Sequence, residues 1–190
     1  MRKALSSTCI FAVCIFAASV PSAAQDVIHA LTGTVSAIDG ASKTITVFQD
    51  NGSTGVFTQM SDPKTRISFD KKVAGAVTAA EKFDKSGAYA IVFFFGNSQN
   101  PTVVALKSLG AGPFESTVGT VTKVESHNRS ISVIDDTGAA HTFKIDQETV
   151  AEGAYGVVDG EKLAVNKGAH VRIVSSKAGG DPTALFVRAM

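Results

Sequence analysis

The sequence has little cysteine, no tryptophan and no strong excess of either charge. Its 190 residues include two Cys, at positions 9 and 14, and 18 basic residues against 17 acidic ones, for a net charge of +1. This balance lacks the basic footprint of many nucleic-acid-binding proteins, so no nucleic acid is expected as a partner. With 44% hydrophobic residues, the chain is too apolar for a disordered protein.

The first 24 residues have the organisation of a secretory signal peptide. Arg2 and Lys3 precede an apolar run at 9–18, and Ser22-Ala23-Ala24 supplies the small residues for cleavage after Ala24. Cleavage would remove both Cys and take the net charge to −1. We therefore expect an exported protein, periplasmic or extracellular. Its mature chain would contain no disulfide, no cysteine nucleophile and no apolar run long enough for a transmembrane span.

Motifs for catalysis are also missing. The sequence contains no Gly-x-Ser-x-Gly elbow and no phosphate-binding glycine-rich loop. Carboxylates gather at Asp135-Asp136 and at Asp146 and Glu148, but Asp residues in turns commonly cap the backbone. A hydrolase that used these carboxylates is the weakest of three function hypotheses. We expect a protein that is not an enzyme and has no cofactor.

One pattern, in contrast, occurs twice in the sequence. Residues 33–47 resemble residues 119–133 at an offset of 86, and residues 87–102 resemble residues 168–183 at an offset of 81. A single change of offset between two matching blocks is what a difference in loop length produces. Two copies of ~80 residues fit two small domains rather than a solenoid, which needs at least three repeats.

Each copy is predicted to be a small β-barrel. In the second copy Val118, Val121 and Val124 recur every three residues, a spacing that indicates a bulged or strongly coiled strand. Strong coiling suits a closed barrel, which has no free edges. The expected fold class is therefore mainly all-β, with two tandem five-stranded OB-like β-barrels. Residues 74–80 of the first copy are compatible with a short helix.

The expected strands and boundaries follow from turn residues and alternating apolar residues. A polar connection with Gly153, Gly156 and Gly160 is expected to lead to a short strand or turn near Leu163. Strands of the second copy are predicted at 116–125, 130–134, 142–145, 169–174 and 184–188. The domains are predicted at 25–109 and 116–190, with a Gly/Pro-containing linker at 110–115.

This pattern resembles a known family. Gly119-Thr120-Val121, the strand Ile131-Ser132-Val133 and the turn at Lys167-Gly168 follow the plan of the exported bacterial domain DUF5666. The resemblance implies an OB-like barrel in the cell envelope and no reaction. The Asp of the family's turn is replaced by Ala169 here and by Ala88 in the first copy.

Residues 88–95, Ala-Tyr-Ala-Ile-Val-Phe-Phe-Phe, are apolar on both faces of a predicted strand. Two explanations stay open. The extra apolar face packs inside the chain, against the second barrel or residues 74–80, or it binds an envelope protein, a lipid or another copy of the chain. The first function hypothesis is therefore a non-enzymatic envelope binding or interaction module. Its binding residues would be Tyr89, Ile91, Phe93, Phe94 and Phe95.

The second function hypothesis is a periplasmic metal-binding protein. Its candidate ligands are His127, in a turn, and His141, at the start of a strand, which could approach each other across a hairpin. The first copy has no His at either position, and the other two His show no short ligand spacing. Residues 25–190 contain two Met and no Trp, few of the soft and aromatic groups that suit copper.

Overall fold

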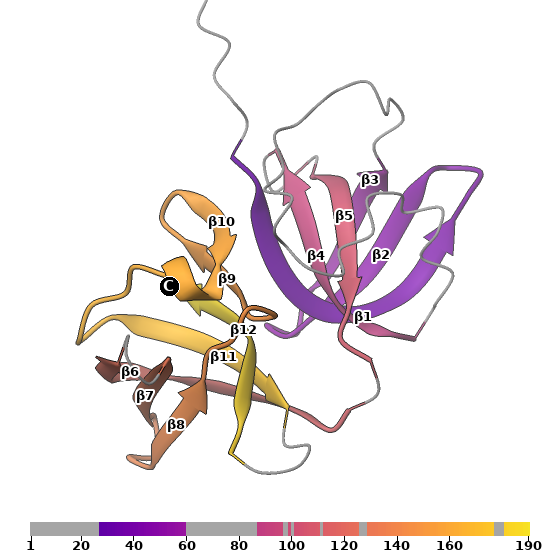
Figure 1. The fold of residues 1–190 in the computed structure, drawn as a ribbon. Helices are drawn as coiled ribbons and strands as arrows, with labels where there is room; N and C mark the ends of the chain where they lie inside the picture. Colours follow the sequence, from indigo (N-terminus) through magenta and orange to yellow (C-terminus); the bar gives the residue numbers. More distant parts are fainter. Residues whose placement is uncertain are drawn as a thin grey trace, which may run out of the picture.

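The protein is described by a computed structural model that covers residues 27–59, 87–96, 99, 101–110, 112–125, 129–176 and 181–190. These residues form twelve β-strands and one short 3-10 helix, and none of them is in an α-helix. The predicted signal peptide and residues 74–80 lie outside the described residues. Figure 1 shows two β units, which we call unit one (β1–β5) and unit two (β6–β12).

Unit one is a closed five-stranded barrel, as predicted. Its strands close in the order β1-β2-β3-β5-β4. Every second side chain of β2 points into the barrel, where Ile45 and Val47 are fully buried with Phe57, Val92 and Leu106. Burial of these apolar side chains stabilises the closed sheet. The strands are β1 (His29–Asp39), β2 (Thr44–Gln49), β3 (Thr54–Gln59), β4 (Tyr89–Phe95) and β5 (Thr102–Ser108).

Unit two contains a similar barrel with an added hairpin. Its strands form one sheet in the order β10-β9-β12-β11-β6-β7-β8, and a pairing of β12 with β8 closes five of them into a ring. The first four strands are β6 (Phe114–Glu125), β7 (Ser130–Asp135), β8 (Ala140–Lys144) and β9 (Val150–Gly153). They are followed by β10 (Gly156–Asp159), the 3-10 helix (Gly160–Lys162), β11 (His170–Ser176) and β12 (Thr183–Ala189). The described residues are thus OB-like and almost entirely β.

The first strand of each unit bends at a corresponding place. The register shifts between Val35 and Ala37 in β1 and between Val121 and Lys123 in β6, so the bulge predicted for the second copy is confirmed. Gly33 and Gly119 lie just before these bulges. A Cβ at either glycine would overlap a backbone carbonyl oxygen of the neighbouring strand, so the strands approach too closely for a side chain.

The glycine-containing connection of unit two is not a polar loop, and that prediction was wrong. Its residues form the hairpin of β9 and β10, and Leu163 only ends the 3-10 helix. Strand β9 pairs in parallel with β12, opposite Phe186, Val187 and Arg188. Because this partner strand is distant in sequence, the local pattern of a four-residue strand did not reveal the pairing.

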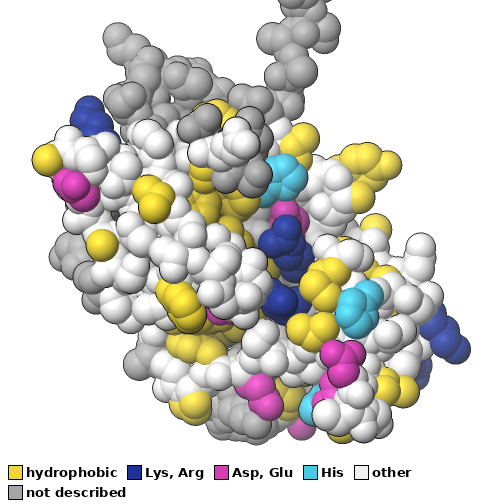
Figure 2. All heavy atoms as spheres, turned by 180° about the vertical axis from the view of Figure 1, so that it is seen from behind, with side chains coloured by type: hydrophobic (Ala, Val, Ile, Leu, Met, Phe, Trp, Pro, Cys, Tyr) yellow, Lys and Arg dark blue, Asp and Glu magenta, His cyan; other side chains and the backbone are white. Residues whose placement is uncertain are grey.

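A third apolar core joins the two units. Ile91 and Phe93 of β4 are fully buried, together with Val150, Val174 and Phe186 of unit two. At the edge of this shared core, buried Lys107 of unit one donates from Nζ to Glu148 Oε2 of unit two at 3.0 Å. Figure 2 shows basic side chains and a histidine gathered where the two units meet. The boundary between the units therefore combines an apolar centre with a polar rim.

Candidate functional site

The strand predicted to bind a partner is mostly covered within the chain. Ala90 and Val92 of β4 belong to the core of unit one, while Ile91 and Phe93 belong to the shared core, and all four are fully buried. Ile91 and Phe93 therefore cannot form a surface for an outside partner, because unit two covers them. The apolar second face of this strand is explained by the contact between the units.

The other three predicted binding residues are half-buried. Phe94 packs edge-on against Phe57, with ring centroids 5.4 Å apart, and lies 5.8 Å from the ring of His29. Phe95 packs against the shared core. Tyr89 lines an open cavity.

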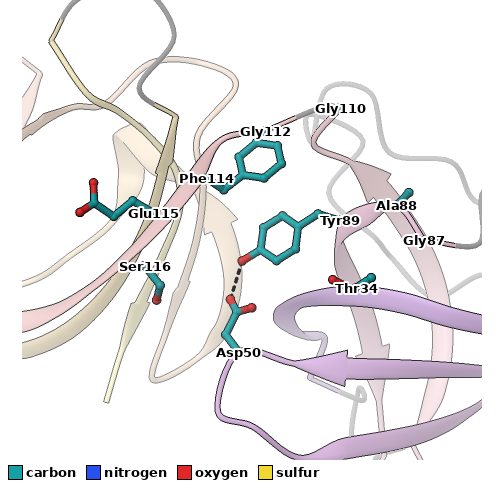
Figure 3. Close-up of a pocket in the computed structure, with 10 residues that line it drawn as sticks. All are labelled: Thr34, Asp50, Gly87, Ala88, Tyr89, Gly110, Gly112, Phe114, Glu115 and Ser116. Atoms are coloured by element: carbon teal, nitrogen blue, oxygen red, sulfur yellow. Dashed lines mark hydrogen bonds between the residues drawn. The ribbon is translucent and has the colours of Figure 1, made fainter.

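This cavity is an open groove of about 510 Å³ at the junction of the units. Its wall combines an aromatic pair with exposed backbone and a few polar side chains (Figure 3). The rings of Tyr89 from β4 and Phe114 from β6 stack with centroids 4.9 Å apart. The described lining residues are Thr34, Asp50, Gly87, Ala88, Tyr89, Gly110, Gly112, Phe114, Glu115 and Ser116.

Asp50 is the acidic group at the base of the groove. Its Oδ2 atom accepts hydrogen bonds from the Tyr89 hydroxyl, at 2.6 Å, and from the Thr32 hydroxyl. Its Oδ1 atom accepts no hydrogen bond from any residue that the structure describes, whereas the Glu115 side chain points away from the groove in Figure 3. The groove thus offers one oriented carboxylate beside an aromatic wall.

The Tyr89 hydroxyl is held in its protonated form. Burial of the side chain is the largest cause and raises the pKa of Tyr89 well above its usual value. The hydrogen bond to Asp50 and the negative charge of Asp50 raise this pKa further, while a hydrogen bond with Thr32 and the positive charge of Arg172 partly offset them. Tyr89 is therefore a hydrogen-bond donor that fixes Asp50, and it does not ionise near neutral pH.

Sequence reasoning found Tyr89 but missed its partners. Asp50 and Tyr89 are 39 positions apart and meet because β4 closes the barrel beside β1. Phe114 falls within the predicted linker, yet it opens β6, two residues before the predicted start of that strand. One signal in the sequence did mark Tyr89 as special: the two copies differ there, because His170 occupies the matching position in the second copy.

The proposed metal ligands are not brought together among the described residues. His127 lies outside them, and His141 Nε2 is 2.7 Å from Asp135 Oδ2. No group of three or more His, Cys, Asp or Glu that could hold a metal occurs in the described part of the chain. The metal site with His127 and His141 stays a prediction.

The turn carboxylates cap the backbone, as their positions suggested. Asp135 Oδ1 accepts from the backbone N–H groups of Thr137 and Ala139, each at 2.9 Å. Hydrogen bonds from Thr137, His141 and Ala139 hold the pKa of Asp135 well below its usual value. Asp146 Oδ1 caps the following turn in the same way, through the backbone N–H groups of Glu148 and Thr149. These contacts give both residues a structural role.

Comparisons with known proteins do not identify a family for this chain. No family model matches the chain, and no curated protein matches it. Among solved structures, a crystal structure of CusF with Ag(I) matches with a TM-score of 0.33 and 13% identity, over 41% of this chain and 99% of that chain. A likeness of this strength carries no argument about function. Within the described residues, no helix has the length and apolar character to cross a membrane.

Proposed function

We propose that the protein is an exported, non-enzymatic binding module whose ligand lies in the groove between the two units. The observation that carries this proposal is the groove itself, because both units build its wall and Tyr89 holds Asp50 in one orientation there. Small-molecule sites are typically concave, with apolar and aromatic walls and a few placed polar groups. The shared core favours a fixed spacing of the two walls.

The chemistry of the groove favours a ligand with a hydrogen-bond donor beside an apolar ring. None of its described lining residues is basic, and the Oδ1 atom of Asp50 has no donor from the described residues. An ammonium or hydroxyl group would satisfy this oxygen. An apolar ring would pack beside Tyr89 and Phe114, whose stacked rings form one wall.

The test uses three probes of nearly equal size that differ in one group: benzylamine, benzyl alcohol and benzoate. Each is titrated into the ¹⁵N-labelled mature protein while amide chemical shifts are recorded. Benzylamine is expected to bind most tightly and to shift the amides of Asp50, Tyr89, Gly110 and Phe114 in a saturable way. Benzoate is expected to bind in the groove more weakly than benzylamine, because its carboxylate is repelled by Asp50.

Asp50→Asn is the informative variant and Asp136→Asn is its matched control. Asn keeps an acceptor for Tyr89 but removes the charge, so benzylamine should lose about tenfold in affinity, or about 1.4 kcal/mol. Asp136 matches Asp50 at the offset of 86, does not line the groove and is exposed. The proposal is wrong if no probe shifts the groove amides, or if Asp50→Asn and Asp136→Asn bind benzylamine as the natural protein does.

We also propose that the two units are copies of one exported domain similar to DUF5666. The support is a set of unusual backbone positions that recur at the offset of 86. Lys43 and Arg129 both have a positive φ, as do Gly52 and Gly138. The ring order β6-β7-β8-β12-β11 of unit two also matches the order β1-β2-β3-β5-β4 of unit one, strand for strand.

A further inference from the structure

Two arginines face each other on neighbouring strands of unit two. Arg172 of β11 and Arg188 of β12 are directly paired, so their side chains leave the same face of the sheet. Both are partly exposed. Like charges at directly opposed positions are destabilising. A negatively charged group close to both arginines would relieve this repulsion.

The described residues supply one carboxylate for the two positive charges. Glu152 is paired with Arg188 across β9 and β12, and its Oε2 atom lies 3.3 Å from Arg188 Nε. Glu152 is only 4% exposed, and its other oxygen contacts His29 Nδ1 of unit one at 2.9 Å. The Oε2 atom is within ion-pair distance of Arg188 but has no aligned hydrogen bond.

Among the residues that the structure describes, Arg172 has no such partner. No described carboxylate forms an ion pair with it, and its positive charge slightly lowers the pKa of Tyr89. Asp50 is the nearest acidic group to Tyr89, but its Oδ2 already accepts from two hydroxyls. The cluster of Arg172, Arg188 and Glu152 therefore carries a net charge of about +1 at neutral pH.

The barrel itself does not require this pair of arginines. At the offset of 81, Ile91 and Lys107 of unit one stand at the positions of Arg172 and Arg188, and they are also directly paired. Ile91 is buried in the shared core, and Lys107 forms an ion pair with Glu148. Unit two has an arginine at both of these paired positions, and unit one has none at either.

We propose that Arg172 and Arg188 form a binding site for a small oxyanion, a phosphate or carboxylate group that bridges the two guanidinium groups. Each guanidinium presents planar N–H donors that match the oxygens of such groups. Figure 2 shows basic side chains at the surface where the units meet, with a histidine and an acidic side chain beside them. The side chains of Arg188 and His29 are 43% and 41% exposed, so an anion can reach them. This site does not depend on the groove.

The test is titration of the mature protein with inorganic phosphate and, separately, with acetate at low ionic strength. Saturable shifts of the Arg172 and Arg188 Nε–H signals are expected for at least one anion, and the stronger anion identifies the ligand class. Binding should also raise the melting temperature of the natural protein, because the anion binds the folded chain. Arg172→Gln should weaken binding by at least about tenfold and abolish the rise in melting temperature.

Arg172→Gln is the primary variant because it removes a charge that has no ion-pair partner among the described residues, so the fold should tolerate it. Arg172→Lys keeps the positive charge but loses the planar guanidinium group. We expect this variant to bind the anion more weakly than the natural protein. Arg129→Gln is the control, since Arg129 forms a separate ion pair with Glu161. Absence of any saturable Nε–H shift, or equal binding by Arg172→Gln and Arg129→Gln, would overturn the proposal.

Discussion

At the scale of single residues, the Tyr89 side chain connects the two units beside the groove. Its ring stacks on Phe114 of unit two, and its hydroxyl donates to Asp50 of unit one. A tyrosine at this position thus combines apolar packing with a directed hydrogen bond. Phenylalanine would keep the stacking and leave Asp50 with the Thr32 hydroxyl alone.

Tyr89→Phe should change how stability depends on alkaline pH. The pKa of Tyr89 is raised in the folded protein, so above about pH 10 the unfolded chain loses this proton first and the free energy of unfolding falls. Tyr89→Phe has no phenolic proton at this position, so this part of the fall in the free energy of unfolding is absent. It should be less stable by about 1 kcal/mol at pH 7, with a shallower decline above pH 10, in urea unfolding followed by circular dichroism.

Tyr155→Phe is the matched control, because Tyr155 is 95% exposed and is the second of two tyrosines in the chain. Its unfolding curves should match those of the natural protein at both pH values. If Tyr89→Phe declines above pH 10 as steeply as Tyr155→Phe, Tyr89 is not a buried, protonated donor.

The sequence alone was enough to predict the apolar face of strands in which apolar and polar residues alternate. Phe143, Val171 and Ile173 alternate with polar residues within the predicted strands, and they are at most 2% exposed in the core of unit two. Phe186 is also an apolar residue of a predicted strand, but it lies in the shared core. Alternation tells which face of a strand is apolar and not what covers it, so the groove and the pairing of Asp50 with Tyr89 were out of reach.

At the scale of elements, the hairpin of β9 and β10 supports unit one. The Val157 N–H group of β10 donates to the Ile28 carbonyl oxygen just before β1, at 2.9 Å. Gly156 begins β10 with a φ of +99°, and a Cβ there would lie 2.6 Å from the same oxygen. Figure 1 shows β10 beside the start of β1. The hairpin therefore needs a glycine where it meets unit one.

Gly156→Ala should destabilise the protein by about 2–5 kcal/mol. About 1–2 kcal/mol comes from the positive φ, and the rest from displacement of the hairpin from Ile28. Urea unfolding at pH 7 measures the loss. A shift of the Val157 amide signal would report the broken hydrogen bond.

Two glycines separate these causes. Gly138→Ala has a φ of +85° with nothing within 4 Å of the added Cβ, so it measures the cost of the backbone conformation alone. Gly153→Ala, in the same hairpin, also has open space around the Cβ and no positive φ, and should cost little. Equal losses for Gly156→Ala and Gly138→Ala would show that the contact with Ile28 adds no stability.

The elements were predicted well where the two copies share their pattern. The strands expected at 130–134 and 184–188 were found at Ser130–Asp135 and Thr183–Ala189. The hairpin of β9 and β10 was missed because its strands are four residues long and depend on pairing with β12 and on Ile28. Its one local signal was the turn between Gly153 and Gly156.

At the scale of the whole molecule, the shared core should make the two units unfold together. Phe93 is fully buried there with side chains of both units. Two barrels with an apolar contact of this kind gain stability from each other that neither has alone. We therefore expect one cooperative thermal transition for the natural protein, with matching calorimetric and van't Hoff enthalpies.

Phe93→Ala should split this transition in two. Loss of a buried Phe side chain costs about 3–5 kcal/mol, and here that loss falls on the contact between the units. Val47→Ala, in the core of unit one alone, should lower the melting temperature and keep one transition. A single transition for Phe93→Ala, with matching enthalpies, would show that the shared core does not couple the units.

The shared core brings matched positions of the two copies together. Phe93 and Ala105 of unit one lie in it with Val174 and Phe186, which are their counterparts at the offset of 81. Like faces in contact form a closed arrangement, as in a symmetric dimer, so the contact is complete with two units. In a dimer of identical chains, both halves of the rim would carry the same residues. When both units belong to one chain, the matched positions can differ. Unit two therefore has Arg172 and Arg188 where unit one has Ile91 and Lys107.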